Sequence, residues 1–430
     1  MNSIKYDKAT STASIAAIVR RTTETSEEVR DSVSKIIADV KARGDAALMA
    51  WTEKLDGVKL QSLRISDETM KAAMRDQVTQ EDLRVLRTAV EHLRTYHEKQ
   101  LEKGYEIQPR PGVSLGQRIV PLRRVGLYIP GGKAAYPSTV LMNAIPAQVA
   151  GVPEIAIFTP PSKDGSVNPY VLAAAGILGI KEIYAVGGAQ AVAACANGTE
   201  TIAPCDKIAG PGNQYVAEAK RQVSGQIAID MIAGPSEVLI IADQTADPEL
   251  VAADLLAQAE HDERAGLVVL TTDESLPERL KAALDRQLET LPKRDIASVS
   301  AANLLVVLCD DLEDACRVSD VIAPEHLELM VENPRALLDK VNYAGSVFLG
   351  SYTPEALGDY YAGTNHTLPT NGTARFSSPL GVYDFMTRFS YLEYTQEAFM
   401  KEASDVEHFA RLEGLDAHAA SVTKRKNLKP

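Results

Sequence analysis

Apolar residues recur at helical spacing in the early part of the chain. Between residues 25 and 103 they fall three or four positions apart, beginning with Val29, Val33, Ile36, Ile37 and Val40. The sequence Thr25-x-x-Glu28 predicts a capping box at the start of the first helix, and Gly44 predicts its end. We therefore expect a helical N-terminal region. Its long last helix is rich in charged residues, so His92 and His97 are expected on the surface.

After Gly104 the pattern changes to short apolar strands that alternate with helical stretches. The first set comprises strand Glu154–Phe158, helix Tyr170–Leu178, strand Glu182–Val186 and helix Ala189–Ala196. The second set comprises strand Val238–Ala242, helix Pro248–Ala259, strand Leu267–Thr271, helix Ser275–Leu288, strand Leu304–Leu308, helix Leu312–Ile322 and strand Leu327–Val331. Strands that alternate with helices form parallel sheets. The predicted fold class is therefore α/β, with two parallel-sheet domains.

Beyond Gly381 the alternation stops and amphipathic helical segments follow, at Ser404–Leu412 and Ala417–Thr423. A tail of about fifty residues is too small to bury a core of its own. We expect it to pack on another surface, and a partner subunit is the candidate.

Composition and charge narrow the function. Hydrophobic residues make up 45% of the chain and charged residues 24%, which is typical of a globular protein. The net charge of −13 argues against a nucleic-acid partner, because phosphate binding needs a basic face. The longest apolar run, Val171–Ile180, is far shorter than the roughly 20 residues that span a bilayer, so we expect no membrane segment. The first ten residues lack the apolar stretch of a secretory signal.

The four cysteines form no CxxC pair and no disulfide framework. They are predicted to be reduced, buried, apolar side chains, which indicates a reducing compartment and a cytoplasmic protein.

Two short segments carry residues suited to chemistry. Gln258 and His261 come at the end of one predicted helix, and their i, i+3 spacing places both on one face, as two ligands of a metal ion require. A capping histidine beside a polar glutamine explains this pair equally well. Glu325 and His326 follow Pro324 at the entrance of a strand, where carboxylate and imidazole can act as two general bases. An exposed turn at a strand entrance is the alternative.

Glycine-rich turns fall where strands of the first α/β set should end. They are Pro130-Gly131-Gly132, Gly187-Gly188-Ala189-Gln190 and Gly210-Pro211-Gly212-Asn213. A glycine turn that opens a helix offers backbone N–H groups to a phosphate, so one domain can hold a dinucleotide. No GxGxxG fingerprint is present, and ordinary turns remain the alternative.

Several longer motifs, taken in order, resemble the histidinol dehydrogenase family. They are Gly126-Leu-Tyr-Ile-Pro-Gly-Gly132, Tyr184-Ala-Val-Gly-Gly-Ala-Gln190, Gly210-Pro-Gly-Asn213, Ala233-Gly-Pro-Ser-Glu237, Gln258-Ala-Glu-His261, Pro324-Glu-His-Leu-Glu328, Gly363-Thr-Asn-His366 and Glu413-Gly-Leu-Asp-Ala-His418. The resemblance runs from about residue 25 to 420. It implies a homodimer that oxidises L-histidinol through L-histidinal to L-histidine, with two NAD reduced in succession, as the last steps of histidine biosynthesis.

The same resemblance implies the roles of individual residues. One Zn²⁺ ion per subunit is held by Gln258, His261, Asp359 and His418, which also contact the substrate. Further substrate contacts come from Ser236, His326, His366 and Glu413. NAD is contacted by Tyr128, Gln190 and Asn213. His326 takes the alcohol proton, and Glu325 activates the water that attacks the aldehyde.

The implied domains follow from these motifs. Residues 1–24 form an N-terminal extension, and residues 25–127 join residues 238–380 in a larger α/β domain with most of the zinc and catalytic residues. Residues 128–237 form the NAD-binding domain. Both are expected to be incomplete Rossmann-like folds. Residues 381–430 form a helical dimerisation tail that exchanges between subunits and brings Glu413 and His418 to the partner's site.

Three other functions compete with this interpretation. A sister enzyme of the same fold oxidises another polar alcohol, such as a sulfonated diol, but His366 and Glu413 favour histidinol. A cysteine-type aldehyde dehydrogenase needs a thiolate nucleophile, and none of the four cysteines lies in the motifs above. A scaffold protein without activity is the third alternative. It would not explain why Glu325 and His326 occur together with intact metal-ligand positions.

Overall fold

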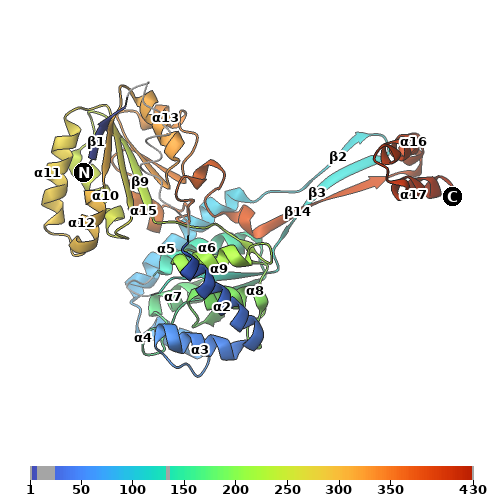
Figure 1. Ribbon diagram of the computed structural model, residues 1–430, viewed down its shortest axis with the longest axis horizontal. Coiled ribbons are helices and arrows are strands. Elements are labelled where there is room, and N and C mark those ends of the chain that lie inside the picture. Colours follow the sequence, from blue (N-terminus) through green and yellow to red (C-terminus); the bar gives the residue numbers. More distant parts are fainter. Residues whose placement is uncertain (1, 7–24, 132–135, 429–430) are drawn as a thin grey trace. The chain divides into compact units, whose positions relative to one another are not determined.

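The computed structural model describes residues 2–6, 25–131 and 136–428. The chain divides into two units (Figure 1). Unit 1 comprises residues 1–100 and 122–385, and unit 2 comprises residues 101–121 and 386–430. Gly132 and most of the expected N-terminal extension, residues 7–24, lie outside the described residues.

Sheet A of unit 1 has six parallel strands in the order β1-β11-β10-β9-β12-β13. The strands are β1 (Asn2–Lys5), β9 (Glu237–Ala242), β10 (Gly266–Thr271), β11 (Leu305–Leu308), β12 (His326–Met330) and β13 (Ser346–Leu349). The helices of this part are α10 (Pro248–Ala259), α11 (Leu276–Leu288), α12 (Arg294–Ala302), α13 (Leu312–Ile322), α14 (Pro334–Leu338) and α15 (Glu355–Tyr360).

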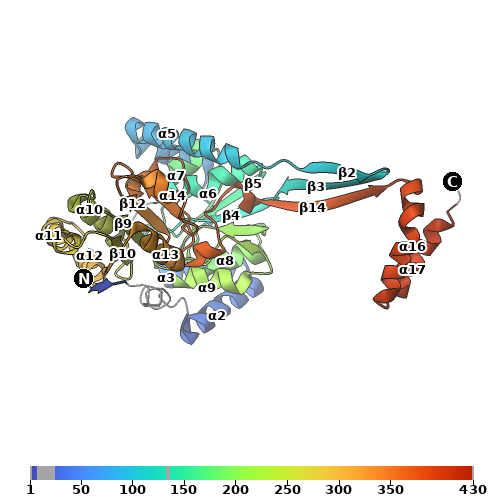
Figure 2. The same cartoon turned by 90° about the horizontal axis from the view of Figure 1, so that it is seen from above.

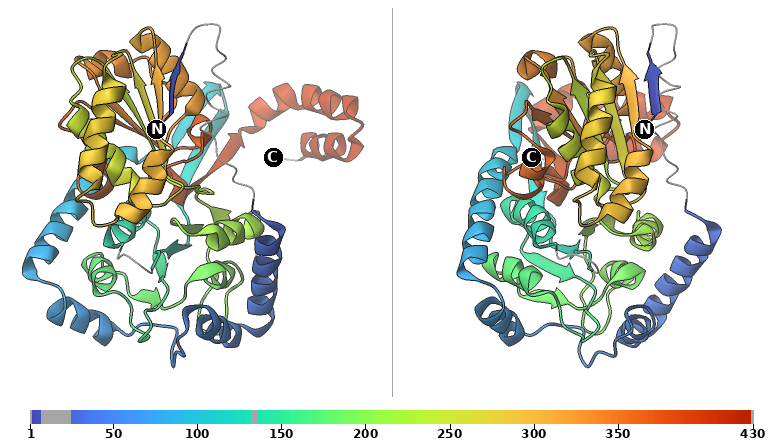
Figure 3. Two further views of the ribbon diagram at one scale, coloured as in Figure 1. Left: turned by 60° about the vertical axis from the view of Figure 1, so that its left-hand side comes forward. Right: turned by 90° about the vertical axis from the view of Figure 1, so that its left-hand side faces the viewer.

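Alternate residues of β9 enter two different cores, one on each face of sheet A. Val238 and Ile240 pack with residues of α10 and α11, whereas Leu239 and Ile241 pack with residues of α13. Helices cover both faces of this sheet (Figure 3). Burial on both faces explains why this strand is a continuous apolar run without polar alternation.

Sheet B of unit 1 has five parallel strands in the order β6-β5-β4-β7-β8. The strands are β4 (Arg124–Tyr128), β5 (Glu154–Phe158), β6 (Glu182–Tyr184), β7 (Lys207–Ala209) and β8 (Ala228–Ile229). The helices are α6 (Pro137–Ala150), α7 (Pro169–Ile177), α8 (Gly188–Asn197) and α9 (Gln214–Val223). The chain reverses its strand order at β4, so the carboxyl ends of β4 and β7 border a topological switch point, the usual ligand position in such sheets.

The prediction of two parallel α/β sheets is confirmed. Every strand and helix expected between residues 154 and 331 is present, with bounds within two residues of the prediction. The hydrophobic pattern did not predict β1 or β13, which are four-residue strands at the two edges of sheet A.

The N-terminal helices are α2 (Glu27–Arg43), α3 (Asp45–Asp56), α4 (Asp67–Asp76) and α5 (Gln80–His97), followed by the short η1 (Glu98–Gln100). The apolar faces of α2 and α3 enter the core of sheet B, where Val33, Val40 and Leu48 pack with Tyr128 and Phe158. The grouping of residues 25–127 with residues 238–380 stays a prediction.

Two local predictions in this region were wrong. The N-cap of α2 is Ser26, whose hydroxyl accepts from the Val29 N–H, so the cap lies one residue beyond Thr25. His97 is buried, because the last helical turn of α5 faces the protein interior, and its Nδ1 lies 2.8 Å from Gln100 Oε1. Burial lowers the pKa of His97. The Gly44 stop and the exposed position of His92 are confirmed.

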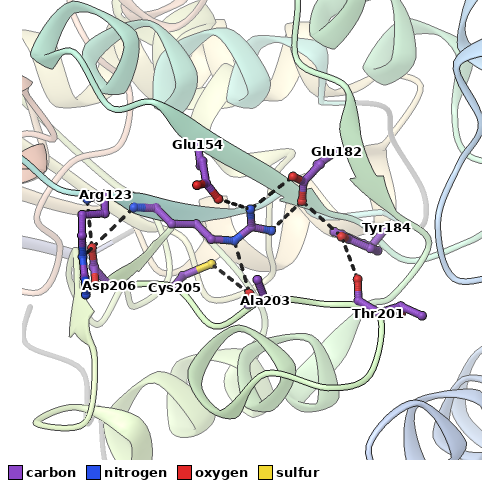
Figure 4. A network of polar contacts seen from close by, with 9 residues as sticks. Arg123, Glu154, Glu182, Tyr184, Thr201, Ala203, Cys205 and Asp206 are labelled. Atoms are coloured by element: carbon purple, nitrogen blue, oxygen red, sulfur yellow. Dashed lines mark hydrogen bonds and ion pairs between the residues drawn. The ribbon is translucent and has the colours of Figure 1, made fainter.

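The amino edge of sheet B is held by a buried cation. Arg124, the first residue of β4, donates to Glu154 at 2.8 Å and to Glu182 at 3.2 Å, which begin β5 and β6. Tyr184 donates to Glu182 and to the Thr201 carbonyl (Figure 4). The guanidinium of Arg124 thus joins the first residues of three neighbouring strands, and this network fixes the strand starts.

Unit 2 contains a three-stranded antiparallel sheet in the order β14-β3-β2, with strands β2 (Tyr105–Arg110), β3 (Val113–Pro121) and β14 (Met386–Tyr394). Helices α16 (Gln396–Leu412) and α17 (Asp416–Lys426) follow β14 and pack on each other (Figure 2). The two predicted helices are confirmed. The tail is not wholly helical, however, because residues 386–394 pair with β3 along their whole length. Phe389 and Tyr391, two positions apart, were the sequence signal for this strand.

All four cysteines are buried and free, as predicted. Within the described part of the chain, no helix combines the length and the apolar character that a bilayer span requires.

Candidate functional site

The site is built at the amino ends of two neighbouring strands of sheet A. His326 is the first residue of β12 and pairs in register with Val238 of β9. Helix α13 ends at Ala323, which has a left-handed backbone (φ 51°), and Pro324 prevents its continuation. The chain therefore enters β12 abruptly, and Glu325 and His326 lie at the strand entrance, as the motif predicted. Both are buried, which the motif did not predict.

The tautomer of His326 is set by the backbone. Its Nδ1 lies 3.0 Å from the carbonyl oxygen of Glu237 and 3.2 Å from Nε2 of Gln258. Because a carbonyl oxygen can only accept, Nδ1 carries a proton, and in the neutral ring Nε2 is therefore the nitrogen with the lone pair. Nε2 is buried and has no hydrogen-bond partner among the described residues. The imidazole is thus fixed in position with one free basic nitrogen.

Three carboxylates surround this imidazole. From Nδ1, Glu325 Oε2 lies 3.7 Å away and Glu355 Oε1 lies 3.9 Å away, while Asp359 Oδ1 lies 3.7 Å from Nε2. The Glu237 N–H donates to Glu325 at 2.8 Å and fixes that side chain. Burial opposes the protonated form of His326, but these carboxylates outweigh it and raise its pKa. Burial raises the pKa of Glu325 to about 8 and that of Glu355 to about 7.

The structure adds Glu355 to the residues found in the sequence. Glu355 and Asp359 lie four residues apart on α15, and this i, i+4 spacing was the signal for them. One ligand atom each of His326, Glu355 and Asp359 lies within 4.8 Å of the others, as a metal site requires. Sequence reasoning also missed two carboxylates beyond Glu355. Glu328 accepts from the Glu355 N–H at 3.1 Å, and burial raises the pKa of Asp254 to about 6.

The predicted metal ligands of unit 1 fit a cation at Asp359. Burial alone would raise the pKa of Asp359, but His326, His366 and His261 lower it, so these imidazoles lie around its carboxylate. Oε1 of Gln258, an acceptor, and Nε2 of His366, which can accept or donate, are both buried. Neither has a hydrogen-bond partner among the described residues. A cation would satisfy the unpaired oxygen of Gln258. Ser236 precedes Glu237 at the start of β9, beside this cluster.

Glu413 and His418 lie in unit 2, and the structure does not join them to the cluster at His326. Glu413 follows α16 and His418 lies in the first turn of α17. Both are exposed and line a groove whose other walls are mostly apolar, including Phe409 and Leu415.

The raised carboxyl pKa values predict how stability depends on pH when the metal is absent. Glu325 and Glu355 have pKa values of about 8 and 7 in the folded protein, against 4.5 ordinarily. Between about pH 6.5 and 8 the folded state therefore binds more protons than the unfolded chain, and the free energy of unfolding falls as the pH rises. From these two pKa values we expect a loss of about 2 kcal/mol over this range in chelator-treated protein, measured by urea unfolding.

Two controls accompany this measurement. Glu325→Gln should remove part of the slope, because the amide does not titrate. Added Zn²⁺ should flatten the profile, since a cation favours the ionised carboxylates. A chelated protein that gains stability from pH 6.5 to 8 would contradict the expected sign.

The predicted dinucleotide residues meet at the carboxyl edge of sheet B. Tyr128 ends β4, and its hydroxyl accepts from the Gly188 N–H at 3.1 Å. Gln190 lies in the first turn of α8, and Asn213 caps α9, its side chain accepting from Tyr215 at 3.0 Å. These segments border the switch point between β4 and β7, where helix N-termini offer N–H groups to phosphates.

Glycine is required where the loop after β7 meets β4. A Cβ at Gly210 would lie 2.1 Å from the Tyr128 carbonyl oxygen, and the backbone there has a positive φ of 117°. The Gly210 N–H donates to Asp230 at 2.8 Å, and Lys220 donates to the Gly210 carbonyl at 2.9 Å. The fully buried ion pair of Lys220 and Asp230 therefore holds this loop in place.

Comparisons with known proteins agree with this arrangement. The model of the histidinol dehydrogenase family matches residues 19–426. The histidinol dehydrogenase of Geobacillus kaustophilus is 52% identical over 409 residues, which cover 95% of this chain and 96% of that protein. The enzyme of Bacillus subtilis is 50% identical over 401 residues, 93% of this chain and 94% of that protein.

A solved structure extends the likeness to three dimensions. The crystal structure of histidinol dehydrogenase from Elizabethkingia anophelis has a TM-score of 0.93 and 39% sequence identity, and the match covers 99% of this chain and 98% of that one. Identity of about half over most of the chain, together with the same fold, assigns both the family and the NAD-linked type of reaction. The chain belongs to the histidinol dehydrogenase family and is an NAD-dependent oxidoreductase.

Proposed function

We propose that this protein oxidises L-histidinol through L-histidinal to L-histidine at one site, with two NAD reduced in succession. The observation that carries the proposal is the fixed imidazole of His326. Its Nε2 lies 3.7 Å from Asp359, and its Nδ1 lies 3.7 Å from the buried carboxylate of Glu325. An alcohol and an aldehyde hydrate each lose a proton when they are oxidised, so two bases with separate roles suit a two-stage reaction.

The two bases divide the work. Nε2 of His326 accepts the proton of the substrate hydroxyl, while the Glu237 carbonyl keeps Nδ1 protonated. The surrounding carboxylates stabilise the imidazolium that results. In the second stage ionised Glu325 takes a proton from the water that attacks the aldehyde. NAD, when bound, supplies the hydride acceptor for both stages.

Zn²⁺ is the proposed metal, with Gln258, His261 and Asp359 of one subunit and His418 of the other as ligands. This donor set brings one carboxylate and three neutral groups, so a net positive charge remains for the amino and imidazole nitrogens of histidinol. Bound zinc would supply a template that orients the substrate. Ser236, His366 and Glu413 are proposed substrate contacts, and Tyr128, Gln190 and Asn213 are proposed NAD contacts.

A second subunit is proposed to cover the apolar face of unit 2. Phe409 is 65% exposed and Leu412 is 70% exposed, and both lie on α16. A unit of two helices and three strands buries little apolar surface of its own. Large apolar side chains exposed on such a unit mark a surface that binds a partner. In a two-fold dimer this face would carry Glu413 and His418 to the partner's cluster at His326.

The competing functions lose support. Relatives at about 50% identity bear the name histidinol dehydrogenase, so oxidation of a sulfonated diol is not favoured. A thiolate mechanism needs an accessible cysteine of low pKa, whereas all four cysteines are buried and burial raises the pKa of Cys309 to about 12. We place the reaction in the cytoplasm, where free thiols stay reduced.

Glu325→Gln and His326→Gln should separate the two stages. Glu325→Gln should retain most of the first oxidation of histidinol and lose about 100-fold or more in the oxidation of histidinal, because the amide cannot accept a proton. His326→Gln should lose at least 100-fold in the first hydride transfer. Stopped-flow measurement of NADH from each substrate gives both rates.

Glu332→Gln, an exposed carboxylate just beyond β12, is the matched control and should behave as the unaltered enzyme. Equal losses on histidinol and histidinal in both variants would refute the division of roles. Oxidation of neither substrate by the unaltered, zinc-loaded enzyme would refute the proposed function.

A further inference from the structure

Asp56 lies at the edge of sheet B that carries the proposed nucleotide site. It is the last residue of α3, which ends at Gly57 in the left-handed conformation (φ 73°). The following residues run beside the loop after β5, since a Cβ at Gly165 would lie 3.5 Å from Leu60 and 3.6 Å from Val58. Leu63 then accepts from the Ala185 N–H at 2.7 Å, just past the carboxyl end of β6. The segment therefore follows the carboxyl ends of β5 and β6.

One oxygen of the Asp56 carboxylate lacks a hydrogen-bond partner among the described residues. That oxygen, Oδ2, is buried and accepts no hydrogen bond from any described residue, and Oε1 of Gln190 at the start of α8 is in the same condition. A carboxylate only accepts, so a buried and unpaired one is costly unless a ligand brings donors. Two unpaired acceptors at one edge indicate a ligand that carries hydroxyl groups.

Tyr128 connects Asp56 to this edge. Burial raises the pKa of Tyr128 to about 12, and the charge of Asp56 adds to the effect, so the two side chains lie close enough to interact. Burial also raises the pKa of Asp56 to about 6, which leaves the carboxylate ionised near pH 8. Helix α3 is held there because Ala47 and Leu48 pack in the same core as Tyr128 and Ala191 of α8.

We infer that Asp56 accepts the hydroxyl hydrogens of the adenosine ribose of NAD and selects NAD against NADP. The inference rests on the proposed nucleotide site. A carboxylate that accepts from ribose is the usual selector for NAD in doubly wound sheets, although there it follows a strand, whereas Asp56 ends a helix that precedes β4. The segment that follows Asp56 lies beside the carboxyl ends of β5 and β6, on the side of β4 away from β7, as the adenosine end requires. A 2′-phosphate would meet its charge and be repelled.

Nucleotide binding can be measured without turnover. Trp51 is the only tryptophan of the chain and lies on α3, five residues before Asp56, so energy transfer from Trp51 to bound NADH reports the affinity in the zinc-loaded enzyme. Asp56→Asn should raise the Kd of NADH by about tenfold, the loss expected for a hydrogen bond to a charged group. The Kd of NADPH should stay within about twofold or fall, because the repulsion is also removed.

The controls separate this inference from the nucleotide site itself. Glu53→Gln removes an exposed carboxylate from the same helix and should leave both Kd values unchanged. Gln190→Ala and Asn213→Ala should weaken NADH and NADPH alike. If these two variants weaken NADH and Asp56→Asn does not, the role of Asp56 is wrong. Equal weakening of NADH and NADPH by Asp56→Asn would also overturn it, as a purely structural effect. If none of the three changes the affinity, the nucleotide site is wrong.

Discussion

Asp359→Asn is expected to lose the bound metal and the activity together. The carboxylate is the one anionic donor of the proposed ligand set. It lies 3.7 Å from Nε2 of His326, and its side chain is 16% exposed. The amide keeps the shape of the side chain but removes the charge that holds a divalent cation. Mutation of a residue that hydrogen-bonds to a metal ligand typically lowers metal affinity or activity by about 10–100-fold. Loss of a direct ligand should cost more, so we expect kcat to fall by more than about 100-fold. His261→Asn should behave similarly, because it deletes a nitrogen donor.

Metal content by atomic absorption and histidinol turnover should be measured on the same preparations. Asp339→Asn, an exposed carboxylate after α14, is the control and should keep both metal and activity. Excess Zn²⁺ should restore part of the activity of the variant if weakened affinity is the cause. Full activity of metal-free Asp359→Asn would refute the ligand assignment.

Two inactive variants should restore activity when their subunits are exchanged. His326→Gln removes the proposed base at the start of β12. His418→Asn removes the proposed metal ligand in the first turn of α17. If each site joins one subunit's cluster with its partner's unit 2, a heterodimer has one site with both defects and one intact site. Random exchange makes about half of the dimers mixed, so activity should recover to roughly a quarter of the unaltered enzyme.

The matched control mixes His326→Gln with Glu325→Gln. Both changes lie in the same cluster, so each site of that heterodimer retains one defect and the complete oxidation of histidinol to histidine should not return. Heterodimers can be confirmed by two affinity tags on the two subunits. Confirmed heterodimers of His326→Gln and His418→Asn that stay inactive would show that unit 2 completes the site of its own chain.

The strands and helices expected from the sequence between residues 154 and 331 could be predicted because their patterns are local, whereas α9, β8 and α12 in the same range were not predicted. Continuous apolar runs such as residues 238–242 become strands buried on both faces, and caps such as Asp247-Pro248 fix where helices begin. The segment Pro324-Glu325-His326 likewise predicted two bases at a strand entrance, since a proline that follows a helix forces the chain to turn. The resemblance of the motifs then identified the family, which spacing rules did not.

Other features depended on contacts between distant residues, which one sequence does not contain. The burial of His97 depends on its surroundings in the fold, with Asn365 Nδ2 lying 3.4 Å from its Nε2. Strand β1 exists because it pairs with β11, some three hundred residues later, and four residues carry too weak a pattern to predict alone. The pairing of β14 with β3 made a strand from residues that we expected to be helical.

The site divides in the same way. The sequence determined which residue types were present and their spacing along each helix and strand, because these are properties of local chain geometry. Only the register of β12 against β9 decided that the carbonyl of Glu237 would fix the tautomer of His326. Only the return of α15 to that edge placed Glu355 and Asp359 around the imidazole. Burial then raised the pKa of Glu325, and burial is a property of the packed structure that no local pattern contains.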